Sequence, residues 1–385
     1  MKFMGYRRND GKVGIRNYVL ILATSVCSNK LAEDISRAVE GSTHINNTFG
    51  CCQLGGDARL TLKTIVNTGI HPNVGAVLVV GLGCEGAEPL EVYNEIKKTG
   101  KKVEMITIQG EGGTLKAFAK GVSISRRFAQ ELSLEKKVEC DISELILGME
   151  CGGSDTTSGL ASNPTCGVAS DILVEMGGTS ILSETTEFIG AEHVVARRGI
   201  NEKVSQEILG LVRGCEERAM ALGEDIRGGQ PTPGNIEGGL TSIEEKSLGC
   251  IHKSGTAPFQ GVLQYADIPA EKGLFIMDTP GQDIESITGM VAGGAQVVIF
   301  TTGRGTPTGN PLAPVIKLTG NFHTFKNMED NIDFDVSEIV SGHKTIKEMG
   351  EKLFEEIVEV CNGKITKAEA LKHREFCIYK IAPTF

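Results

Sequence analysis

Short apolar runs and helix-like segments alternate along the first third of the chain. The apolar runs cover residues 18–24, 44–47, 76–83 and 103–110. Apolar residues recur at helical spacing over residues 28–40, 55–69, 89–100 and 114–132. Strands that alternate with helices build a parallel sheet with helices packed on its faces. The pattern therefore predicts a doubly wound α/β domain at the start of the chain.

The run AVLVVGLG at residues 76–83 is apolar at almost every position. A strand with two apolar faces is typical of the centre of a parallel sheet that helices cover on both sides. The polar segment 133–143 then interrupts the alternation. We place the domain boundary there, so that residues 1–136 form a Rossmann- or flavodoxin-like domain with a doubly wound parallel sheet.

The second part of the chain shows the same kinds of pattern at longer intervals. Apolar runs cover residues 144–151, 179–187, 273–278, 295–303 and 314–319, and helical patterns cover 164–176, 201–221 and 343–364. The segment 228–239 is rich in glycine and proline, so we expect no regular structure there. These patterns predict a larger second α/β domain over residues 137–385, and we expect this domain to be catalytic.

Composition narrows the class of protein. Of the 385 residues, 40% are hydrophobic and 23% are charged, and no apolar run has the length that crosses a bilayer. No signal peptide is evident, so we expect a soluble cytoplasmic protein whose thiols stay reduced. The net charge of −10 and the absence of Trp disfavour nucleic acid. We therefore expect neither a nucleic acid nor a membrane as a partner.

Several apolar runs end in a cysteine or an acid. These residues are Cys27, Cys51, Cys84, Glu85, Glu150, Cys151, Glu184 and Glu187. In open α/β sheets, ligands bind beyond the carboxyl ends of the strands. A single buried cysteine is most often just a small apolar residue, but its recurrence at strand ends, beside acids and glycines, favours a binding site.

The residue types at these strand ends suit two kinds of metal site. Thiolates from separate strands suit iron, either as a single ion or as a cluster. Carboxylates and histidine suit a harder divalent ion, and this set comprises Glu85, Glu150, Asp155, Glu184 and His193. No CxxC pair is present, which disfavours a zinc ribbon. The residues alone leave both kinds of site open.

Three common site motifs are missing or altered. The stretch GLGCEG after residue 80 does not have the GxGxxG spacing of a dinucleotide-binding turn. FTTGRGTPTGN fails the spacing of a phosphate-binding loop, and no GxSxG elbow of a serine hydrolase occurs. A nicotinamide enzyme, a nucleotide hydrolase and a serine hydrolase are therefore disfavoured.

Long blocks around these residues resemble the altronate and galactarate dehydratase family over nearly the whole chain. The N-terminal blocks are GYRRNDGKVGIRNYVLIL, TFGCCQLGGD, HPNVGAVLVVGLGCE and ECGGSDTTSGLASNP. The later blocks are SETTEFIGAE, GNIEGGLTSIEEKSLGC, TGMVAGGAQVVIFTTGRGTPTGNP and IDFDVSEIVSGHKT. So many blocks in the same order make the resemblance far more specific than any single motif.

The resemblance implies a lyase that removes water from a sugar acid, such as altronate or galactarate, to give a 2-keto-3-deoxy acid. Members of the family usually depend on divalent iron, so Fe²⁺ or another divalent cation is the implied cofactor, with an iron–sulfur cluster as the alternative. A sister branch, the large subunit of sulfolactate sulfo-lyase, expels sulfite instead. A non-catalytic sugar-acid-binding subunit is a further alternative. Full-length members carry an additional small N-terminal domain, so we expect a separate small subunit. We also expect a homo-oligomer.

The chemistry of such an elimination assigns roles to the candidate residues. A cation stabilises the enediolate that forms when a proton leaves the carbon next to a carboxylate, while a base and an acid move protons. The candidate metal ligands are Cys84, Glu85, Glu150 and Cys151, joined by Cys27, Cys51 and Cys250 for a cluster. The candidates for proton transfer are Lys246, Lys253, His343 and Asp155. The candidates for substrate binding are Arg16, Asn163, Thr302 and Arg304. We expect these side chains to converge from both domains on one cation.

Overall fold

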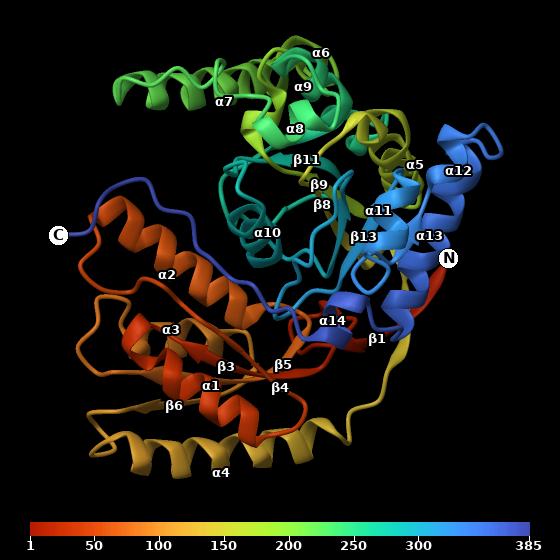
Figure 1. Cartoon of the computed structure of the whole chain (residues 1–385). Coiled ribbons are helices and arrows are strands. Elements are labelled where there is room, and N and C mark those ends of the chain that lie inside the picture. Colours follow the sequence, from red (N-terminus) through yellow and green to blue (C-terminus); the bar gives the residue numbers. More distant parts are fainter.

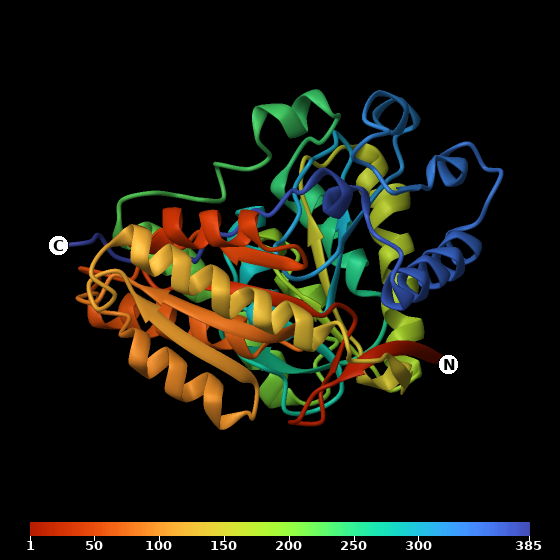
Figure 2. The ribbon, with the colours of Figure 1, turned by 90° about the horizontal axis from the view of Figure 1, so that it is seen from below.

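Two parallel sheets and one small antiparallel sheet organise the computed structural model, which describes all residues 1–385. The first parallel sheet has the strand order β4-β3-β5-β6 and the second has the order β10-β11-β9-β8-β12-β13-β14. In Figure 1 the four-stranded part lies below the seven-stranded part, and in Figure 2, seen from below, it lies in front. The predicted α/β class with parallel sheets is confirmed.

The four-stranded sheet is covered by helices on both faces. Its strands are β3 (Tyr18–Ala23), β4 (Ser42–Ile45), β5 (Val74–Gly81) and β6 (Lys102–Thr107). Its helices are α1 (Asn29–Ala38), α2 (Gly55–Ile70), α3 (Pro89–Lys98) and α4 (Thr114–Leu132). Helices α1 and α4 pack on one face, and α2 and α3 pack on the other. Every residue of β5 is buried, as its two apolar faces predict.

The seven-stranded sheet is parallel throughout. Its strands are β8 (Ile146–Cys151), β9 (Thr179–Leu182), β10 (Phe259–Leu263), β11 (Gly273–Met277), β12 (Val297–Thr301), β13 (Val315–Thr319) and β14 (Phe334–Asp335). Helices α5 (Asn163–Glu175) and α13 (Ile346–Asn362) cover one face, and α10 (Asp283–Ala292) covers the other and packs on α2. One apolar cluster therefore runs between the two sheets.

A chain excursion after β9 stands above the carboxyl ends of this sheet (Figure 1). It contains α6 (Glu192–Ala196), α7 (Glu202–Ala221), α8 (Pro233–Glu237), α9 (Ile243–Ile251) and the turn η5 (His252–Ser254). The shorter helices near the C-terminus are α11 (Phe322–Asn327), α12 (Ser337–Val340) and α14 (Lys367–Leu371). No helix of the protein combines the length and apolar character needed to cross a membrane.

The two ends of the chain link the sheets. Strand β1 (Lys2–Arg7) pairs antiparallel with β2 (Val13–Gly14) and with β7 (Val138–Asp141), which follows α4. At the other end, the amides of Ile381 and Ala382 donate to the Asp57 carboxylate on α2, at 2.9 and 2.8 Å. The last residues of the chain therefore lie against the four-stranded part.

Candidate active site

A polar cavity of about 850 Å³ opens at the carboxyl ends of β8 and β9, beneath the excursion. Only three of its 21 lining residues are hydrophobic. Its floor includes Cys151, Glu184 and Asp283, and its walls include Lys246 and Arg304. A cavity of this size and polarity fits a small, oxygen-rich molecule rather than an apolar one.

Glu150 lies at the end of β8 and is fully buried. One carboxylate oxygen, Oε2, accepts hydrogen bonds from Ser183 Oγ at 2.9 Å and from Ser286 Oγ at 2.6 Å. The other oxygen, Oε1, is buried without a partner. Burial, followed by the nearby Glu184 carboxylate, raises the pKa of Glu150 well above its ordinary value. An unpaired buried oxygen of this kind is suited to bind a cation.

Glu184 follows β9 in a left-handed backbone conformation, with φ 67° and ψ 71°. This conformation is strained for a residue with a side chain and costs roughly 1–3 kcal/mol. The Glu184 amide donates to Thr279 Oγ1 at 2.7 Å, and this contact holds the turn. Its carboxylate accepts from the Cys151 amide at 3.0 Å and from Lys253 Nζ. The strained turn thus directs an acid to the carboxyl ends of the strands.

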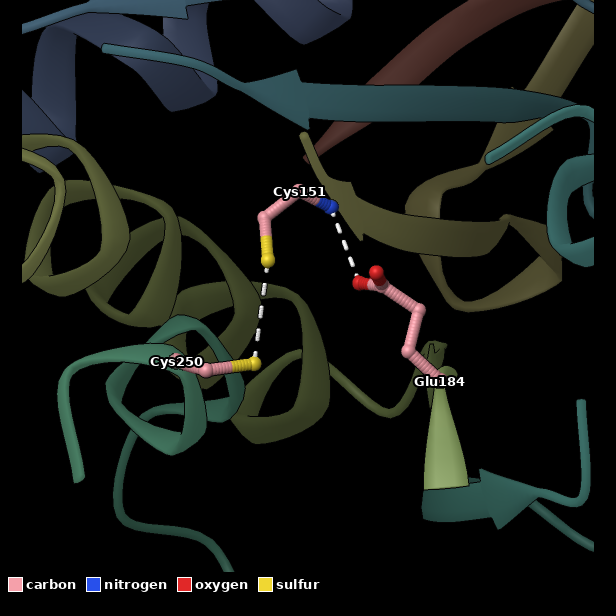
Figure 3. A group of neighbouring side chains, drawn as sticks. All are labelled: Cys151, Glu184 and Cys250. Carbon is pink, nitrogen blue, oxygen red and sulfur yellow. Dashed lines mark hydrogen bonds between the residues drawn. The ribbon is translucent and has the colours of Figure 1, made fainter. Parts of the chain in front are cut away.

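A thiol pair and a buried ammonium group flank the same carboxylate. The Sγ atoms of Cys151 and Cys250 lie 3.7 Å apart, and Lys253 Nζ donates to Cys151 Sγ at 3.0 Å. Figure 3 shows the two sulfurs facing each other while the Glu184 carboxylate reaches the Cys151 backbone. The contact with Cys250 and burial raise the pKa of the Cys151 thiol well above its ordinary value.

Lys253 keeps its charge although its side chain is fully buried. Burial favours the neutral amine, but Cys151, Cys250 and Glu184 outweigh it and raise the pKa of Lys253 well above its ordinary value. A buried ammonium group is tolerated when ionic partners surround it. Lys253 therefore neutralises part of the acidic floor.

Two overlapping groups of side chains could hold a metal ion. Each supplies three atoms that lie within 4.8 Å of one another, and both contain Glu184. One group is Glu150, Glu184 and Asp283, and the other is Cys151, Glu184 and Cys250. Burial, and then Glu184, raise the pKa of Asp283 to about 7. Since crowded carboxylates repel one another when ionised, a divalent cation fits the oxygen group well.

Lys246 on α9 faces the cavity from the excursion. Its Nζ donates to Glu187 Oε1 at 2.8 Å and to Gln230 Oε1 at 2.9 Å. Burial opposes the charged form, but the Glu187 carboxylate outweighs it and raises the pKa of Lys246. Lys246 thus presents an ammonium group at the cavity wall, which suits an anionic ligand.

Arg304 lies at the rim of the cavity in the loop after β12. Its Nη1 donates to Gly234 O at 2.9 Å and pairs with Glu237 at 2.8 Å. The side chain remains about two-fifths exposed. These contacts tie the loop to α8, and the guanidinium stays accessible at the cavity mouth.

Three further candidates support the loops around the cavity through internal hydrogen bonds. Asp155 accepts from the backbone of Thr157 at 2.9 Å and from Asn321 Nδ2 at 2.8 Å. Asn163 donates to a backbone carbonyl of α9 at 3.0 Å, and Thr302 Oγ1 accepts a backbone amide at 2.9 Å. None of the three lines the cavity. Their short polar side chains instead satisfy backbone groups of the loops, as is usual for such residues.

Two candidates lie away from the cavity altogether. Arg16 pairs with Glu369 at 2.7 Å and donates to Val360 O at 2.9 Å, so its guanidinium fastens α13 and α14 to the N-terminal segment. His343 is exposed, and its Nδ1 lies 2.7 Å from Ser341 Oγ. Arg16 thus serves packing and His343 lies at the surface, and neither lines the cavity.

The predicted metal set is divided between the two sheets. Cys27, Cys51, Cys84 and Glu85 lie at the carboxyl edge of the four-stranded sheet and line no part of the cavity. The expectation of convergence on one cation therefore does not hold for the whole set. All these residues follow apolar runs, and the sequence pattern does not reveal which sheet each run joins.

Sequence reasoning does not single out Asp283, and it names Glu187 only as a strand-end acid. Asp283 is the first residue of α10, six positions after β11 ends at Met277. The rule that ligands bind beyond parallel strands could have found it, because the run at 273–278 is a clear strand pattern. The loop between β11 and α10, however, contains no cysteine or histidine that would mark it as part of a site.

Comparisons with known proteins identify the family of the chain. The C-terminal model of the D-galactarate/altronate dehydratases matches residues 142–384, and the second-domain model of D-galactarate dehydratase/altronate hydrolase matches residues 5–133. The chain is 40% identical to the (2R)-sulfolactate sulfo-lyase subunit beta of Chromohalobacter salexigens, over 98% of this chain and 97% of that protein.

Two dehydratases are also similar along nearly the whole chain. Altronate dehydratase of Bacillus subtilis is 32% identical over 99% of this chain and 78% of its own length. Galactarate dehydratase (L-threo-forming) of Escherichia coli is 34% identical over 94% of this chain and 73% of its own length. The resemblance inferred from the sequence blocks is confirmed. The chain belongs to the D-galactarate/altronate dehydratase family, a family of lyases.

Proposed function

We propose that the protein is a metal-dependent hydro-lyase that dehydrates a sugar acid, such as altronate or galactarate, to a 2-keto-3-deoxy acid. The observation that carries this proposal is the oxygen group of Glu150, Glu184 and Asp283, of which Glu184 and Asp283 line a large polar cavity and Glu150 is fully buried. Family membership supports a lyase, and the volume of about 850 Å³ leaves ample room for a six-carbon acid.

The oxygen group would hold a divalent cation, and Fe²⁺ is the ion that the family resemblance favours. Such a cation supplies Lewis acidity to the carboxylate and hydroxyl of a bound acid. The Oε1 atom of Glu150 has no hydrogen-bond partner and is therefore free to bind such a cation. Lys253 holds the Glu184 carboxylate in position through an ion pair. The residues present therefore fit a resident metal ion.

Lys246 is the group that we assign to proton transfer at the substrate. Its ammonium group faces the cavity and is paired with Glu187, so a proton given to a departing hydroxyl can be replaced through that pair. Arg304 at the mouth is placed to bind a substrate carboxylate. The carboxylates of the floor would otherwise repel an anionic substrate, and these two cations offset that repulsion.

A second candidate, elimination of sulfite from sulfolactate, has its own support. The similarity to a sulfo-lyase subunit beta covers 97% of that protein, whereas it covers 78% of the altronate dehydratase from Bacillus subtilis. The name of that relative also supports a second subunit as a partner of this chain. Both reactions remove a leaving group from the carbon next to an acidic carbon, so the same cavity chemistry serves either.

The test begins with chelator-treated protein under anaerobic conditions. We expect Fe²⁺ to bind with a measurable heat and to restore formation of a 2-keto acid from altronate or galactarate. Release of sulfite from sulfolactate, without keto-acid formation from the sugar acids, would assign the second candidate. Full turnover after complete metal removal would overturn both.

Glu150→Gln is the informative variant, with Glu285→Gln as its control. The amide oxygen of glutamine can still accept hydrogen bonds from Ser183 and Ser286, but the side chain loses the negative charge that attracts a cation. Glu285 lies on the same helix as Asp283 and contacts Cys377 rather than the cavity. We expect metal binding to fall at least about tenfold in Glu150→Gln and to be unchanged in Glu285→Gln. Equal metal binding in both variants would contradict the assignment of the oxygen group.

A further inference from the structure

All four exposed cysteines of the protein gather at one edge of one sheet. Cys27 follows β3, the neighbours Cys51 and Cys52 follow β4, and Cys84 follows β5. These three strands are adjacent in the sheet, in the order β4-β3-β5. The other seven cysteines are buried or half-buried. Because cysteine is among the most buried residue types, this cluster, which we call the edge thiols, indicates a specific role.

Backbone hydrogen bonds join the three loops that carry the edge thiols. The Val26 amide donates to Phe49 O at 3.1 Å, and the Ala87 amide donates to Gly50 O at 2.9 Å. Gly50 has φ +99°, and a Cβ atom there would lie only 2.1 Å from Thr24 O. Glycine is therefore required where the middle loop is wedged between its neighbours. The four sulfurs are carried by one connected backbone framework.

Glu85 fixes the loop of Cys84. Its Oε2 accepts from the Gly83 amide at 2.6 Å and from the Cys84 amide at 2.9 Å, while Oε1 accepts from Leu82 at 2.8 Å and from Thr24 Oγ1 at 2.7 Å. Burial opposes ionisation, but these hydrogen bonds outweigh it and lower the pKa of Glu85. The carboxylate therefore positions the thiol loop and binds it to the loop after β3.

The edge thiols do not form a compact site for a single ion. A single tetrahedral ion with sulfur ligands at about 2.3 Å needs those sulfurs close together, and neither group of donor atoms within 4.8 Å includes an edge thiol. Only Cys51 and Cys52 have sulfurs within hydrogen-bonding range, at 3.7 Å, and adjacent residues do not readily bind one centre together. Thiolates of an iron–sulfur cluster bind different irons, so they do not need to converge on one ion.

We propose that Cys27, Cys84 and one residue of the Cys51–Cys52 pair ligate an iron–sulfur cluster at the carboxyl edge of the four-stranded sheet. Each thiol releases its proton on coordination, as metal binding to cysteine requires. Three protein thiolates leave one iron of a four-iron cluster open to a ligand from outside the chain. The cluster is separate from the cavity metal, so this inference goes beyond the proposed function.

The test is anaerobic reconstitution of the full chain with ferrous iron, sulfide and a thiol reductant. Bound iron, acid-labile sulfide, visible absorption and the electron paramagnetic resonance of the reduced sample are then measured. We expect wild-type protein to retain both iron and sulfide. Cys27→Ser and Cys84→Ser should each retain at least about tenfold less sulfide. Comparing Cys51→Ser with Cys52→Ser identifies the ligand from the adjacent pair.

Two controls separate this result from loss of folding and from the cavity metal. Cys215→Ser changes a half-buried thiol on α7, and Glu150→Gln changes the cavity, so both should retain the sulfide. Alkylation with iodoacetamide gives a second readout, because the edge thiols of each folded variant should react before reconstitution and be protected afterwards. Iron bound without sulfide, undiminished sulfide in Cys84→Ser, or edge thiols that stay reactive after loading would each overturn the proposal.

Discussion

At the scale of single residues, the most unusual feature is a lysine buried among thiols and acids. Lys253 contacts Glu184 and Cys151, and its side chain has no exposed surface. Two charges removed from water are stable only as a pair, because either one alone would keep its full cost of desolvation. The ion pair therefore stabilises the buried Glu184 carboxylate and also holds it in position at the cavity.

Lys253→Met should destabilise the metal-free protein by about 3–5 kcal/mol, since it leaves the Glu184 carboxylate buried without its cation. The double variant Lys253→Met/Glu184→Gln should recover most of that loss, because it removes both charges. Urea unfolding of the two single variants and the double variant measures this coupling. Additive losses, with no recovery in the double variant, would show that the pair contributes nothing to stability.

Lys246 should be required for turnover. Lys246→Gln removes the ammonium group that faces the cavity, so kcat/KM should fall by about 100-fold or more. Lys203, which is exposed on α7, offers a matched control as Lys203→Gln. Steady-state kinetics with the substrate identified by the acid screen measures the effect. Unchanged kcat/KM in Lys246→Gln would remove this residue from the proposed mechanism.

At the scale of elements, glycines set how closely α5 packs. A Cβ atom at Gly167 would lie 2.2 Å from His252 O, and one at Gly350 on α13 would lie 2.4 Å from Val168 Cβ on α5. The turn η5, which carries Lys253, therefore rests directly on the backbone of α5. Helix packing and the position of the buried lysine are thus linked through one glycine.

Gly167→Ala should destabilise the protein by about 1–3 kcal/mol and lower activity, because the new methyl group displaces the backbone of η5. The control is Gly210→Ala on α7, where nothing lies within 4 Å of the added atom. That change should stabilise the protein by roughly 0.5–1 kcal/mol, since alanine favours a helix over glycine. Thermal unfolding of both variants measures these effects. Equal shifts of the melting temperature in the same direction would contradict this packing argument.

At the scale of the whole molecule, buried polar side chains join the two parallel sheets. The Nε2 atom of His71 donates to Ala295 O at 3.0 Å, and its Nδ1 accepts from the Asn73 amide at 3.1 Å. Asn73 in turn donates to Gln296 O at 2.9 Å and to Leu312 O at 3.0 Å. This junction holds the four-stranded part against the seven-stranded part without a charged group.

Burial lowers the pKa of His71 to about 3. The unfolded chain therefore binds a proton more readily than the folded protein does between its ordinary pKa near 6.5 and about 3. The stability contribution is complete above pH 6.5 and is lost as the pH falls through this window, at up to about 1.4 kcal/mol per pH unit.

Urea unfolding between pH 7 and pH 4 should show a smaller loss of stability in His71→Gln than in wild type, because the variant has no proton to bind at this site. His323→Gln on the exposed side of α11 is the control for losing a histidine. The extra loss of stability in wild type, measured for each protein relative to pH 7, should grow as the pH falls. Parallel curves for the two proteins would show that His71 does not control acid stability.

Some strands of the fold could be predicted from the sequence, and others could not. The apolar runs at 18–24, 76–83 and 144–151 correspond to β3, β5 and β8, because a strand buried on both faces leaves a local apolar signature. The antiparallel sheet of β1, β2 and β7 was not predicted. Its strand β1 alternates between buried and exposed residues in a short segment, and its partner β7 lies more than a hundred residues away.

The residues of the candidate site could likewise be predicted only in part. Glu150, Cys151, Cys250, Lys246 and Lys253 all lie at or beside the cavity, and sequence reasoning named each of them. It also named Arg16 and His343, because an arginine or histidine that packs against a helix and one that binds a ligand look identical in a sequence. The contact of Arg16 with Glu369 spans 353 positions, so no local pattern could reveal it.

The sequence by itself determined the rhythm of strands and helices, the family, and the kinds of side chain that end each strand, since all of these are local properties of the chain. Only the tertiary structure decided that the edge thiols and the cavity acids belong to two different sheets. The physical reason is that strand order depends on which buried faces pack together across long separations in the chain. Two equally apolar strands can therefore belong to different sheets, and the residues that follow them then lie at separate sites.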